Sequence, residues 1–478
     1  MSKYDANLVV IGAGSGGLVA ALIAAAVKAK VILIERDKMG GDCLNTGCVP
    51  SKALLRSAKI ANYMNRAEEF GFAKVDVQPQ FKEIMQRVQD VIATIEPHDS
   101  VERFTGLGVE CVQGEGKVID KHTVQVGDRT IRTKNIILSA GARPFVPPIE
   151  GLAEVGYLTS DSVWELEALP KRLVVLGGGP IGCELSQAFS KLGAEVTVVE
   201  MMDQLMGRED GDVAETIKTR FEKDGIRVLT SHKAVRFEQN DGKQLVCESA
   251  EGEVVIPFDQ VLVAVGRKPN TDGMELEKHG IKLRPNGTIE TDEYMRTAVP
   301  NIFACGDITG PFQFTHTASH QAWYATVNAL FGFARKFKAD YRVIPWATFT
   351  MPEVARVGIN EREAAEQQLD VQVTRYGIDD LDRAIADGEA HGFVKVITPK
   401  GKDTVLGVTI VGHHAGDLIA EYVLAMKYNI GLNKILGTIH LYPSLAEANK
   451  FVAGVWKREN QPHGLLKWVE KFHRWRLG

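Results

Sequence analysis

The stretch Leu8-Val-Val-Ile-Gly12-Ala-Gly14-Ser-Gly-Gly17 sets the architecture of the N-terminal region. The apolar run Ala6–Ile11 is typical of a buried parallel strand, an alanine-rich helix follows the glycines, and a second apolar run, 30–35, ends in Glu35. Such glycines let backbone amides approach a pyrophosphate at a helix start, and the acid accepts from a ribose hydroxyl. The stretch therefore predicts a βαβ unit that binds a dinucleotide.

The same pattern occurs a second time. A strand at Arg172–Leu176 leads into Gly177-Gly-Gly179-Pro-Ile-Gly182, a helix runs to Leu192, and the strand Glu195–Val199 is followed by Glu200. A lone glycine motif is weak evidence, but each copy here has its two strands and its acid. The sequence therefore predicts two bound dinucleotides.

Between the two copies lies Gly40-Gly-Asp-Cys43-Leu-Asn-Thr-Gly-Cys48-Val-Pro-Ser-Lys52. Four intervening residues let a helical turn bring both sulfurs within bonding reach, and a helix start or a nearby cation stabilises a thiolate. By itself the pair is compatible with a structural disulfide, half a metal site or a redox couple. No second Cys or His pair stands at zinc spacing, and the neighbouring dinucleotide motif favours a redox couple.

Composition narrows the class of protein further. A length of 478 residues suggests about three domains, and a net charge of −5 gives no reason to expect nucleic acid. Six cysteines are too few for a disulfide scaffold, so we expect a reducing, cytoplasmic compartment. The apolar run at 8–27 is interrupted by glycines and ends at Lys28, which argues against a membrane span. The remaining cysteines are expected to be buried small hydrophobes: Cys111, Cys183, Cys247 and Cys305.

Together these motifs resemble the flavin-dependent pyridine nucleotide–disulfide oxidoreductases, the family of lipoamide dehydrogenase, glutathione reductase and mercuric reductase. The resemblance runs along essentially the whole chain. It implies an α/β fold with two Rossmann-like dinucleotide-binding domains and an α+β C-terminal dimerisation domain. It also implies a homodimer that binds FAD at residues 1–150 and 271–340, NAD at 151–270, and its partner through 341–478.

The resemblance also assigns the cofactor contacts. The first glycine motif would hold FAD, Asp307 would contact its ribityl chain, and the second motif would hold a nicotinamide nucleotide. Glu200 suits a 2′-hydroxyl and repels a 2′-phosphate, and no arginine follows it, so we expect NADH to be preferred over NADPH. The other cofactor-binding positions are Gly41, Lys52, Gly114, Ser139, Gly141, Gly266 and Gly306.

Roles for the reactive residues follow from the same resemblance. Electrons would pass from the nicotinamide to the flavin, then to the cysteine pair and out to an acceptor. Cys48 would be the sulfur nearest the flavin, and Cys43 the thiol that meets the substrate. Lys52 would lie beside the flavin, with Glu184 as its ion-pair partner.

The segment His440-Leu-Tyr442-Pro443-Ser-Leu-Ala-Glu447 departs from the pattern of the disulfide reductases. These enzymes carry a catalytic His immediately before the Pro, with a Glu that orients it. Here Tyr442 takes that place, as in mercuric reductases, and His440 is two residues early. A phenol titrates near pH 10 and is a poor base for a thiol at neutral pH. We expect Tyr442 and Glu447, rather than His440, to reach the cysteine pair of the other subunit.

The acceptor is therefore left between two classes, a small-molecule disulfide and a soft metal ion held by thiolates. No resident metal site is expected, and the sequence ends Trp475-Arg-Leu-Gly478 without the cysteine pair by which mercuric reductases deliver their metal ion. One alternative is lipoamide dehydrogenase proper, with His440 as the base. Another, of a different class, is a flavin and thiol redox sensor that turns over very slowly.

The C-terminal tail carries an apolar stripe at near-helical spacing with basic residues among it. We expect a helix that packs on the body of the protein or on the dimer mate, and the alternative is contact with an anionic membrane surface. The residues of the stripe are Leu465, Leu466, Trp468, Val469, Phe472 and Trp475, and the basic residues are Lys467, Lys471, Arg474 and Arg476.

Overall fold

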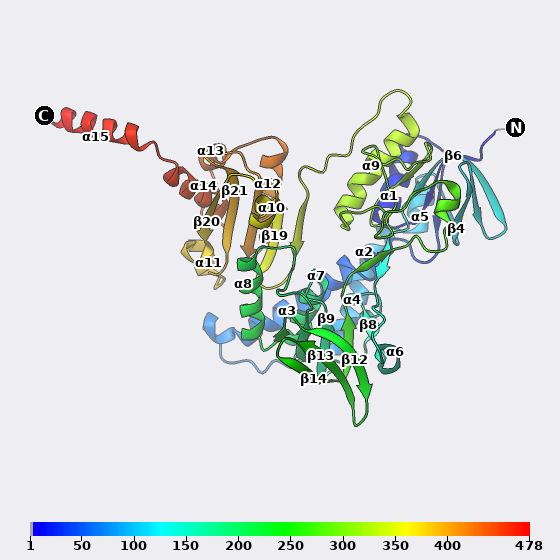
Figure 1. Ribbon diagram of the computed structural model, residues 1–478, viewed down its shortest axis with the longest axis horizontal. Helices are drawn as coiled ribbons and strands as arrows, with labels where there is room; N and C mark the ends of the chain where they lie inside the picture. The colour runs from blue at the N-terminus through cyan, green and yellow to red at the C-terminus, as the bar shows by residue number, and fades with distance from the viewer. Residues whose placement is uncertain (1–2) are drawn as a thin grey trace. The chain divides into compact units, whose positions relative to one another are not determined.

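The computed structural model describes residues 3–478, except for the side chain of His463, and the chain divides into two compact units (Figure 1). The first unit contains residues up to 203 together with 221–340. The second contains 204–220 together with 341–478. Each unit has its own β-sheet structure and its own hydrophobic core.

The central sheet of the first unit is parallel around β1 (Ala6–Ile11). Ile11 lies level with Ile34 of β2 (Val31–Glu35) and with Leu138 of β6 (Arg129–Leu138). The residues that follow these strands therefore meet at one edge, where ligands of such sheets bind. The order is β3-β2-β1-β6-β5-β4, with β17 also on β6; the remaining bounds are β3 (Val109–Gln113), β4 (Gly116–Asp120), β5 (Thr123–Val126) and β17 (Ile302–Ala304).

Helices cover one face of this sheet. α1 (Ser15–Ala26) and α9 (Thr315–Phe331) pack against each other, as Figure 1 shows, and both contact the strands of the sheet. The antiparallel β4–β5 hairpin contributes Val118 and Val124 to a core that also contains Val9 and Ile136. The sheet is thereby buried on both faces, which explains the nearly continuous apolar sequences of its inner strands.

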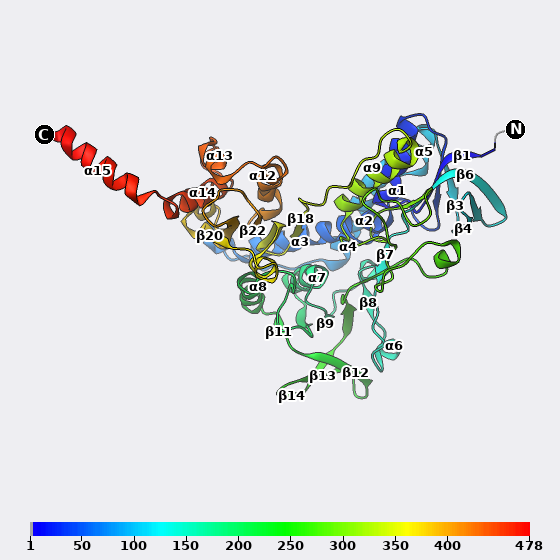
Figure 2. The same cartoon turned by 45° about the horizontal axis from the view of Figure 1, so that its top comes forward.

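The second sheet repeats this arrangement. Its order is β11-β10-β9-β15-β8, from β8 (Leu158–Thr159), β9 (Arg172–Leu176), β10 (Glu195–Val199), β11 (Arg227–Leu229) and β15 (Gln260–Val263). Leu176 lies level with both Val199 and Val263, so the residues after these strands also share an edge. A meander packs against this sheet (Figure 2); it consists of β12 (Lys233–Gln239), β13 (Lys243–Ser249) and β14 (Gly252–Phe258).

Further elements of the first unit connect these two sheets. The chain leaves the first sheet through β7 (Ala142–Pro144) and returns from the second through β16 (Arg267–Pro269), and these two strands pair as an antiparallel ribbon. α3 (Cys48–Asn65) packs against both α4 (Phe81–Ile95) and α7 (Pro180–Lys191). The other helices of this unit are α2 (Gly41–Asn45), α5 (Val101–Gly106) and α6 (Leu152–Val155).

The second unit is built on an antiparallel sheet, with helices packed on it. The strand order is β18-β19-β22-β21-β20, from β18 (Pro345–Thr348), β19 (Glu353–Gly358), β20 (Val371–Gly377), β21 (Phe393–Pro399) and β22 (Gly407–Gly412). Its core includes Val396, Ile410, Tyr422 and Trp456. The helices are α10 (Glu361–Glu366), α11 (Asp382–Ala386), α12 (Ala415–Lys427), α13 (Leu432–Gly437), α14 (Glu447–Glu459) and α15 (His463–Leu477). This α/β architecture with a separate antiparallel domain confirms the predicted fold class.

Within the second unit, buried ion pairs attach residues 204–220, which include most of α8 (Gly211–Lys223), to residues 341–478. The Arg356 side chain is 1% exposed, lies 3.1 Å from Glu209 and 2.9 Å from Glu363, and stacks on Trp346 with 4.3 Å between Cζ and the ring centre. Burial raises the pKa of Glu209, while Arg356 opposes that rise. A guanidinium with two carboxylates and an aromatic face is well suited to such a buried position.

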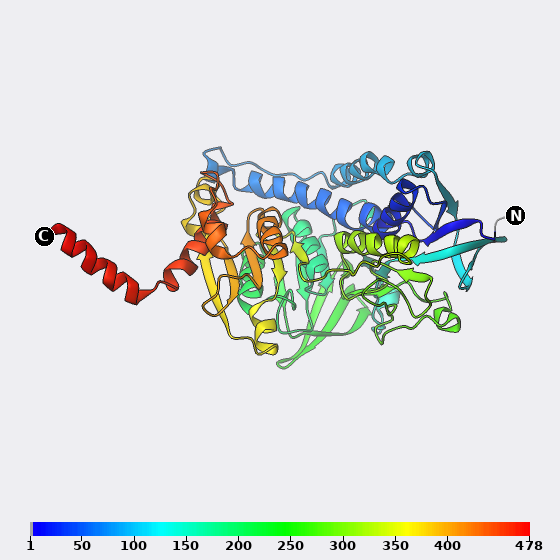
Figure 3. The ribbon, with the colours of Figure 1, turned by 90° about the horizontal axis from the view of Figure 1, so that it is seen from above.

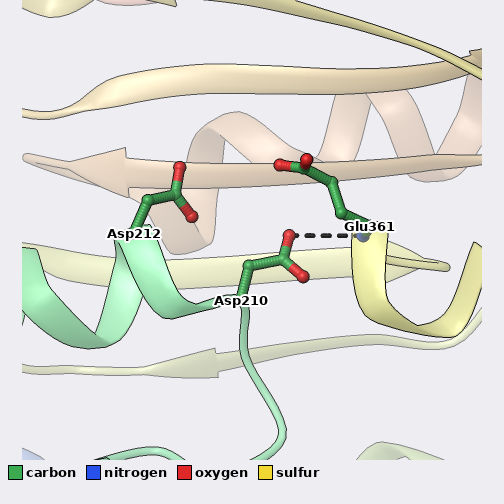
Figure 4. Close-up of side chains that lie close together, drawn as sticks. All are labelled: Asp210, Asp212 and Glu361. Atoms are coloured by element: carbon green, nitrogen blue, oxygen red, sulfur yellow. Dashed lines mark hydrogen bonds between the residues drawn. The ribbon is translucent and has the colours of Figure 1, made fainter. Parts of the chain in front are cut away.

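Three carboxylates of the second unit, Asp210, Asp212 and Glu361, turn toward one another (Figure 4). The Nζ atom of Lys395 lies 2.8, 2.8 and 2.7 Å from them, and its side chain is 2% exposed. Burial acts to lower the pKa of Lys395, but the three carboxylates raise it above its ordinary value. The ammonium group thus occupies the centre of this cluster, which we regard as a structural ion network.

The apolar pattern of the sequence predicts one strand at 110–119 and another at 123–132, and the structure divides both. The run at 110–119 is two strands, β3 and β4, separated at Gly114, whose φ is +142°. The run at 123–132 is the hairpin of β5 and β6, which turns at Gly127, whose φ is +54°. A positive φ at glycine ends a strand where an apolar pattern alone suggests continuation. The stretch 53–104, whose polar and apolar pattern predicts helices, contains most of α3 together with α4 and most of α5.

Among residues 3–478, no helix combines the length and the hydrophobicity that crossing a membrane requires.

Candidate active site

In the first glycine motif, an added Cβ atom would clash with the backbone at Gly12 and Gly17 but not at Gly14. Gly12 has φ +100°, and a Cβ atom there would lie 2.3 Å from the carbonyl oxygen of Ser139. A Cβ atom on Gly17 would lie 1.7 Å from the carbonyl oxygen of Gly12. Gly14 caps α1 without a side-chain hydrogen bond, and the nearest atom to its ideal Cβ is Cα of Gly41 at 3.9 Å. The amides of the first turn of α1 are thus available to a pyrophosphate.

The second motif has the same geometry. Gly177 has φ +102° and would meet Ala264 O at 2.5 Å, and Gly182 would meet Gly177 O at 1.9 Å. Gly179 caps α7 without a side-chain hydrogen bond, and nothing lies within 4 Å of its ideal Cβ. At both motifs, the glycine at the helix start thus leaves open a space that a side chain would fill.

The acid that follows each second strand is held in a matching way. Glu35 accepts from the amide of Ala13 at 2.6 Å and from that of Asp37 at 2.8 Å. Glu200 accepts from the amide of Gly178 at 2.6 Å and from that of Met202 at 2.8 Å. These bonds fix both carboxylates beside the glycine turns, where a nucleotide ribose would lie.

Asp307 is held at the edge of the first sheet. It lies 3.8 Å from Arg267, which also forms an ion pair with Asp42. Burial raises the pKa of Asp307 to about 6, and Arg267 opposes that rise. The preceding amide, of Gly306, donates to Gln321 Oε1 at 2.6 Å.

The other predicted cofactor positions lie around the first sheet and the ribbon. Ser139 directly follows β6, and its hydroxyl would be 2.7 Å from a Cβ atom on Gly16. Gly141 and Gly266 precede β7 and β16, and their ideal Cβ atoms have nothing within 4 Å. Gly114 directly follows β3, and a Cβ atom there would lie 2.6 Å from the side chain of Val126. The uncapped helix starts and open glycines fit two dinucleotides, one at each glycine motif.

The cysteine pair spans a break between two helices. Cys43 lies in α2, and Cys48 is the first residue of α3. The indole N–H of Trp164 donates to the carbonyl oxygens of Thr46 and Ser160 at 2.8 and 2.7 Å, which fixes the connecting turn. The two sulfurs are thereby held close enough for a hydrogen bond between them.

The two thiols have opposite electrostatic environments. A hydrogen bond from Cys43, assisted by the hydroxyl of Thr315 and the charge of Lys52, lowers the pKa of Cys48 to about 6. The same hydrogen bond, together with burial, raises the pKa of Cys43. The position of Cys48 at the start of α3 also favours negative charge. In the dithiol form, Cys48 is therefore the thiolate and Cys43 the thiol.

Lys52 lies one helical turn after Cys48, and its Nζ atom is 2.8 Å from Oε2 of Glu184 on α7. The side chain of Lys52 is 38% exposed and that of Glu184 only 7%. The packing of α3 against α7 brings the two residues together. A cation is thus held beside the thiolate by a carboxylate from the second glycine-motif helix.

Sequence reasoning missed several residues of this site. The hydroxyl of Thr315 lies 3.3 Å from Sγ of Cys48, although 267 positions separate them. Arg267, which links Asp42 with Asp307, was also not predicted. No motif marks these residues, because only the packing of α9 and the ribbon on the first sheet brings them to the cysteines.

Tyr442 and Glu447 lie in the second unit. Tyr442 is 66% exposed, and its hydroxyl donates to Asp382 at 2.9 Å. This hydrogen bond raises the pKa of Tyr442. Glu447 begins α14, is buried, and accepts from the amide of Ser444 at 3.2 Å. Asp382 is a further residue that the sequence did not indicate.

The side chain of His440 is only 6% exposed. Its Nδ1 lies 3.1 Å from the carbonyl oxygen of Thr438, and its Nε2 lies 3.0 Å from Glu421. Asn449 donates to the other oxygen of the Glu421 carboxylate at 2.9 Å. Both ring nitrogens are thus engaged within the second unit, in contrast to the exposed phenol of Tyr442.

Comparisons with known proteins cover both units. Residues 6–322 match the sequence profile of the family described as "Pyridine nucleotide-disulphide oxidoreductase", and residues 344–452 match its dimerisation domain. The dihydrolipoyl dehydrogenase of Chlamydia pneumoniae is 37% identical over 448 residues, which is 92% of this chain and 95% of that protein. The mercuric reductase of Staphylococcus aureus is 34% identical over 450 residues, 94% of this chain and 82% of that protein.

A solved structure also matches nearly the whole chain. It is the Cu(II) complex of the HOCl-induced flavoprotein disulfide reductase RclA from Escherichia coli, with a TM-score of 0.84 and 26% identity. The match covers 95% of this chain and 99% of that one. The similarity therefore includes both glycine motifs, the cysteine pair and the antiparallel domain, while α15 begins beyond the matched dimerisation profile.

Proposed function

The chain belongs to the pyridine nucleotide-disulphide oxidoreductase family, and from this premise we propose that it uses NADH to reduce a thiophilic metal ion at the Cys43–Cys48 pair. Members of this family are NAD(P)H-dependent oxidoreductases that bind FAD and carry a redox-active disulfide. Membership of the family determines neither the electron acceptor nor the preference between NADH and NADPH, so both are proposed here.

The observation that carries the proposal is the environment of Tyr442. A disulfide reductase needs a base that takes a proton from a thiol near neutral pH, and imidazole is suited to this task. The phenol of Tyr442 has a pKa raised by its hydrogen bond to Asp382. It is therefore a poor base for thiol exchange, but its exposed hydroxyl oxygen suits polar contact with a metal ion beside the thiolates.

The dithiol itself suits a soft metal ion. Cys48 is a thiolate at neutral pH, and a cation that replaces the proton of Cys43 would gain a second thiolate ligand. The balanced reaction is NADH plus Hg(II) giving NAD⁺, H⁺ and Hg(0), or NADH plus two Cu(II) giving NAD⁺, H⁺ and two Cu(I). When bound, the flavin would carry the two electrons between the nicotinamide and the cysteine pair. Lys52, fixed by Glu184, would keep negative charge on Cys48.

Two of the similar proteins support a metal acceptor by their names alone. One relative is a mercuric reductase, and the solved structure of RclA is a complex with Cu(II). Neither name identifies the metal for this chain. The proposal therefore commits to the class of thiophilic ions, with Hg(II) and Cu(II) as the two probes.

A residue exchange at position 442 tests this proposal. Tyr442→His restores an imidazole before Pro443 and is expected to raise lipoamide turnover while metal-ion reduction falls. Tyr442→Phe, the matched control, removes only the hydroxyl and is expected to lower metal-ion reduction without creating lipoamide activity. If Tyr442→His leaves both activities unchanged, position 442 does not select the acceptor and the argument from the phenol fails.

We infer NADH rather than NADPH as the electron donor. Glu200 is fixed by two backbone amides at the second motif, and a 2′-phosphate there would meet a carboxylate. Met201 and Met202 follow it, without a cation for that phosphate. A lower KM for NADPH than for NADH would contradict this inference. In Glu200→Gln, the preference for NADH should weaken.

The second candidate function is that of dihydrolipoyl dehydrogenase, which the 37% identical relative favours. It would require His440 to act as the base, although both of its ring nitrogens are engaged with Thr438 and Glu421. Substantial lipoamide turnover that disappears in His440→Ala but persists in Tyr442→Phe would establish this candidate.

A further inference from the structure

The C-terminal helix α15 (His463–Leu477) follows α14 as a separate helix (Figure 3). Of the side chains described in it, all are exposed except Val469, which is half-buried. Trp468 is 63% exposed and Trp475 76%. The helix therefore does not pack on the body of its own chain, and its apolar residues have no cover within the described residues. Packing on the dimer mate, the other half of the expectation, stays a prediction.

The apolar residues of α15 form one face. Trp468 and Phe472 stack with 5.9 Å between their ring centres, and Trp475 lies 6.0 Å from Phe472. Leu465 and Val469 lie at helical spacing along the same side. The helix thus presents two indoles, one phenyl ring and aliphatic side chains together.

A basic edge runs beside this face. Lys467, Lys471 and Arg474 follow one another at intervals of four and three residues, so they lie along one line of the helix. Arg474 pairs with Glu470 at 2.6 Å, and Arg476 lies over the ring of Phe472, with 5.9 Å between Cζ and the ring centre. The helix therefore carries four Lys or Arg side chains against one carboxylate, in a chain whose net charge is −5.

We propose that α15 docks on an anionic phospholipid surface, with its aromatic face in the headgroup region and its basic edge at the phosphates. Tryptophan and phenylalanine on one face with Lys and Arg beside them is the composition of helices that lie in a membrane interface. Anionic lipids attract each such cation, and the attraction declines over a Debye length. The long side chain of Arg476 reaches from beside Phe472 toward the headgroups.

A second copy of this chain is the competing occupant of the same face. The matched dimerisation profile ends at residue 452, so α15 lies outside it. Pairing two copies of α15 through the aromatic face would also bring their basic edges together, with only one carboxylate, Glu470, on each helix to balance four Lys or Arg side chains. The surplus of positive charge favours a lipid surface, and this inference does not depend on which acceptor the enzyme reduces.

The test uses the full-length, FAD-loaded protein and sedimentation with vesicles. Vesicles of phosphatidylcholine alone are compared with vesicles that also contain phosphatidylserine. We expect binding at least about tenfold tighter to the anionic vesicles, and weaker binding as NaCl rises. Lys467→Glu with Lys471→Glu should weaken binding by about fivefold or more for each lysine. Trp468→Ala with Trp475→Ala should weaken it on both kinds of vesicle.

The matched control is Lys400→Glu with Lys402→Glu, which changes the net charge equally at an exposed turn of the second unit. This control should bind anionic vesicles almost as the unchanged protein does. NADH oxidation with a soluble acceptor should be the same in all variants, which shows that each is folded. Equal binding to both vesicle types, or loss of binding in the control, would overturn the proposal. A second result would also overturn it: the unchanged protein binds neither kind of vesicle, and the α15 variants are monomeric where the unchanged protein is dimeric. In that case α15 would be an interface between two copies of the chain.

Discussion

At the scale of single residues, the asymmetry of the two thiols makes a prediction about pH. Because the pKa of Cys48 is lowered to about 6, its thiolate predominates above that pH and is lost as the pH falls through it. Alkylation of the reduced enzyme by iodoacetamide should therefore rise in rate through pH about 6, and the label should lie on Cys48. Peptide mass spectrometry identifies the labelled cysteine. Preferential labelling of Cys43 at neutral pH would contradict the assignment.

Variants of the two hydrogen-bond partners separate their contributions to this pKa. Cys43→Ala removes the largest cause and should move the pKa of Cys48 up toward its ordinary value of 9.0. Thr315→Val removes a smaller cause and should produce a smaller rise, while Thr315→Ser keeps the hydroxyl and should produce none. An unchanged alkylation profile in Cys43→Ala would show that the dithiol hydrogen bond does not set the thiolate.

The ion pair of Lys52 and Glu184 makes a prediction about stability. Lys52→Met leaves the Glu184 carboxylate, 7% exposed, without this cation, and should lower the free energy of unfolding by about 1–3 kcal/mol. In the double variant Lys52→Met, Glu184→Gln the loss should be smaller than the sum of the two single losses. Denaturant unfolding of the four proteins measures both effects, and strictly additive losses would show that the 2.8 Å contact contributes nothing.

At the scale of elements, the two kinds of glycine in the second motif should respond differently to alanine. Gly182→Ala would place Cβ 1.9 Å from a backbone oxygen and should destabilise the protein by about 1–3 kcal/mol. Gly179→Ala has nothing within 4 Å and should leave stability unchanged while raising the KM for NADH on the order of tenfold. Thermal unfolding and steady-state kinetics distinguish them. Equal effects of both substitutions on stability would contradict this division of roles.

The bounds of individual strands indicate how much of the fold could be predicted from the sequence. Ala6–Ile11, Arg172–Leu176 and Glu195–Val199 are strands with the expected bounds, because a buried parallel strand next to a glycine turn has a local sequence signal. The division of 110–119 into two strands depends on a positive φ at Gly114, which hydrophobicity does not indicate.

Contacts between distant segments explain what the sequence could not predict. Thr315 beside Cys48, and Lys395 among the acids of 204–220 and α10, result from packing between segments far apart in the chain. Similarly, His440 and Tyr442 are two residues apart, yet their exposure differs because one ring is bonded to Glu421 and the other faces outward. The residue types of the site and the pairing of Lys52 with Glu184 were predicted from the sequence, but the other partners were not.

At the scale of the whole molecule, residues 344–452 match a dimerisation domain, and we expect a homodimer in which Tyr442 acts at the cysteine pair of the other subunit. Mixed dimers test this arrangement. A subunit with Cys43→Ser and Cys48→Ser is combined with a subunit that carries Tyr442→Phe. If the residues meet across the dimer, one intact site forms and about half of the activity returns, because each mixed dimer otherwise has two defective sites. Mixed dimers as inactive as their parents would contradict it.

The most direct test of the proposed function is anaerobic NADH oxidation by the purified enzyme, with Hg(II), Cu(II) and lipoamide as acceptors run side by side. The exposed phenol of Tyr442 and the thiolate of Cys48 predict turnover with a thiophilic metal ion and little with lipoamide. Strong lipoamide turnover with little metal-ion reduction would contradict this account and favour dihydrolipoyl dehydrogenase. Failure with every acceptor, while NADH still reduces the flavin, would contradict it as well and favour a redox sensor.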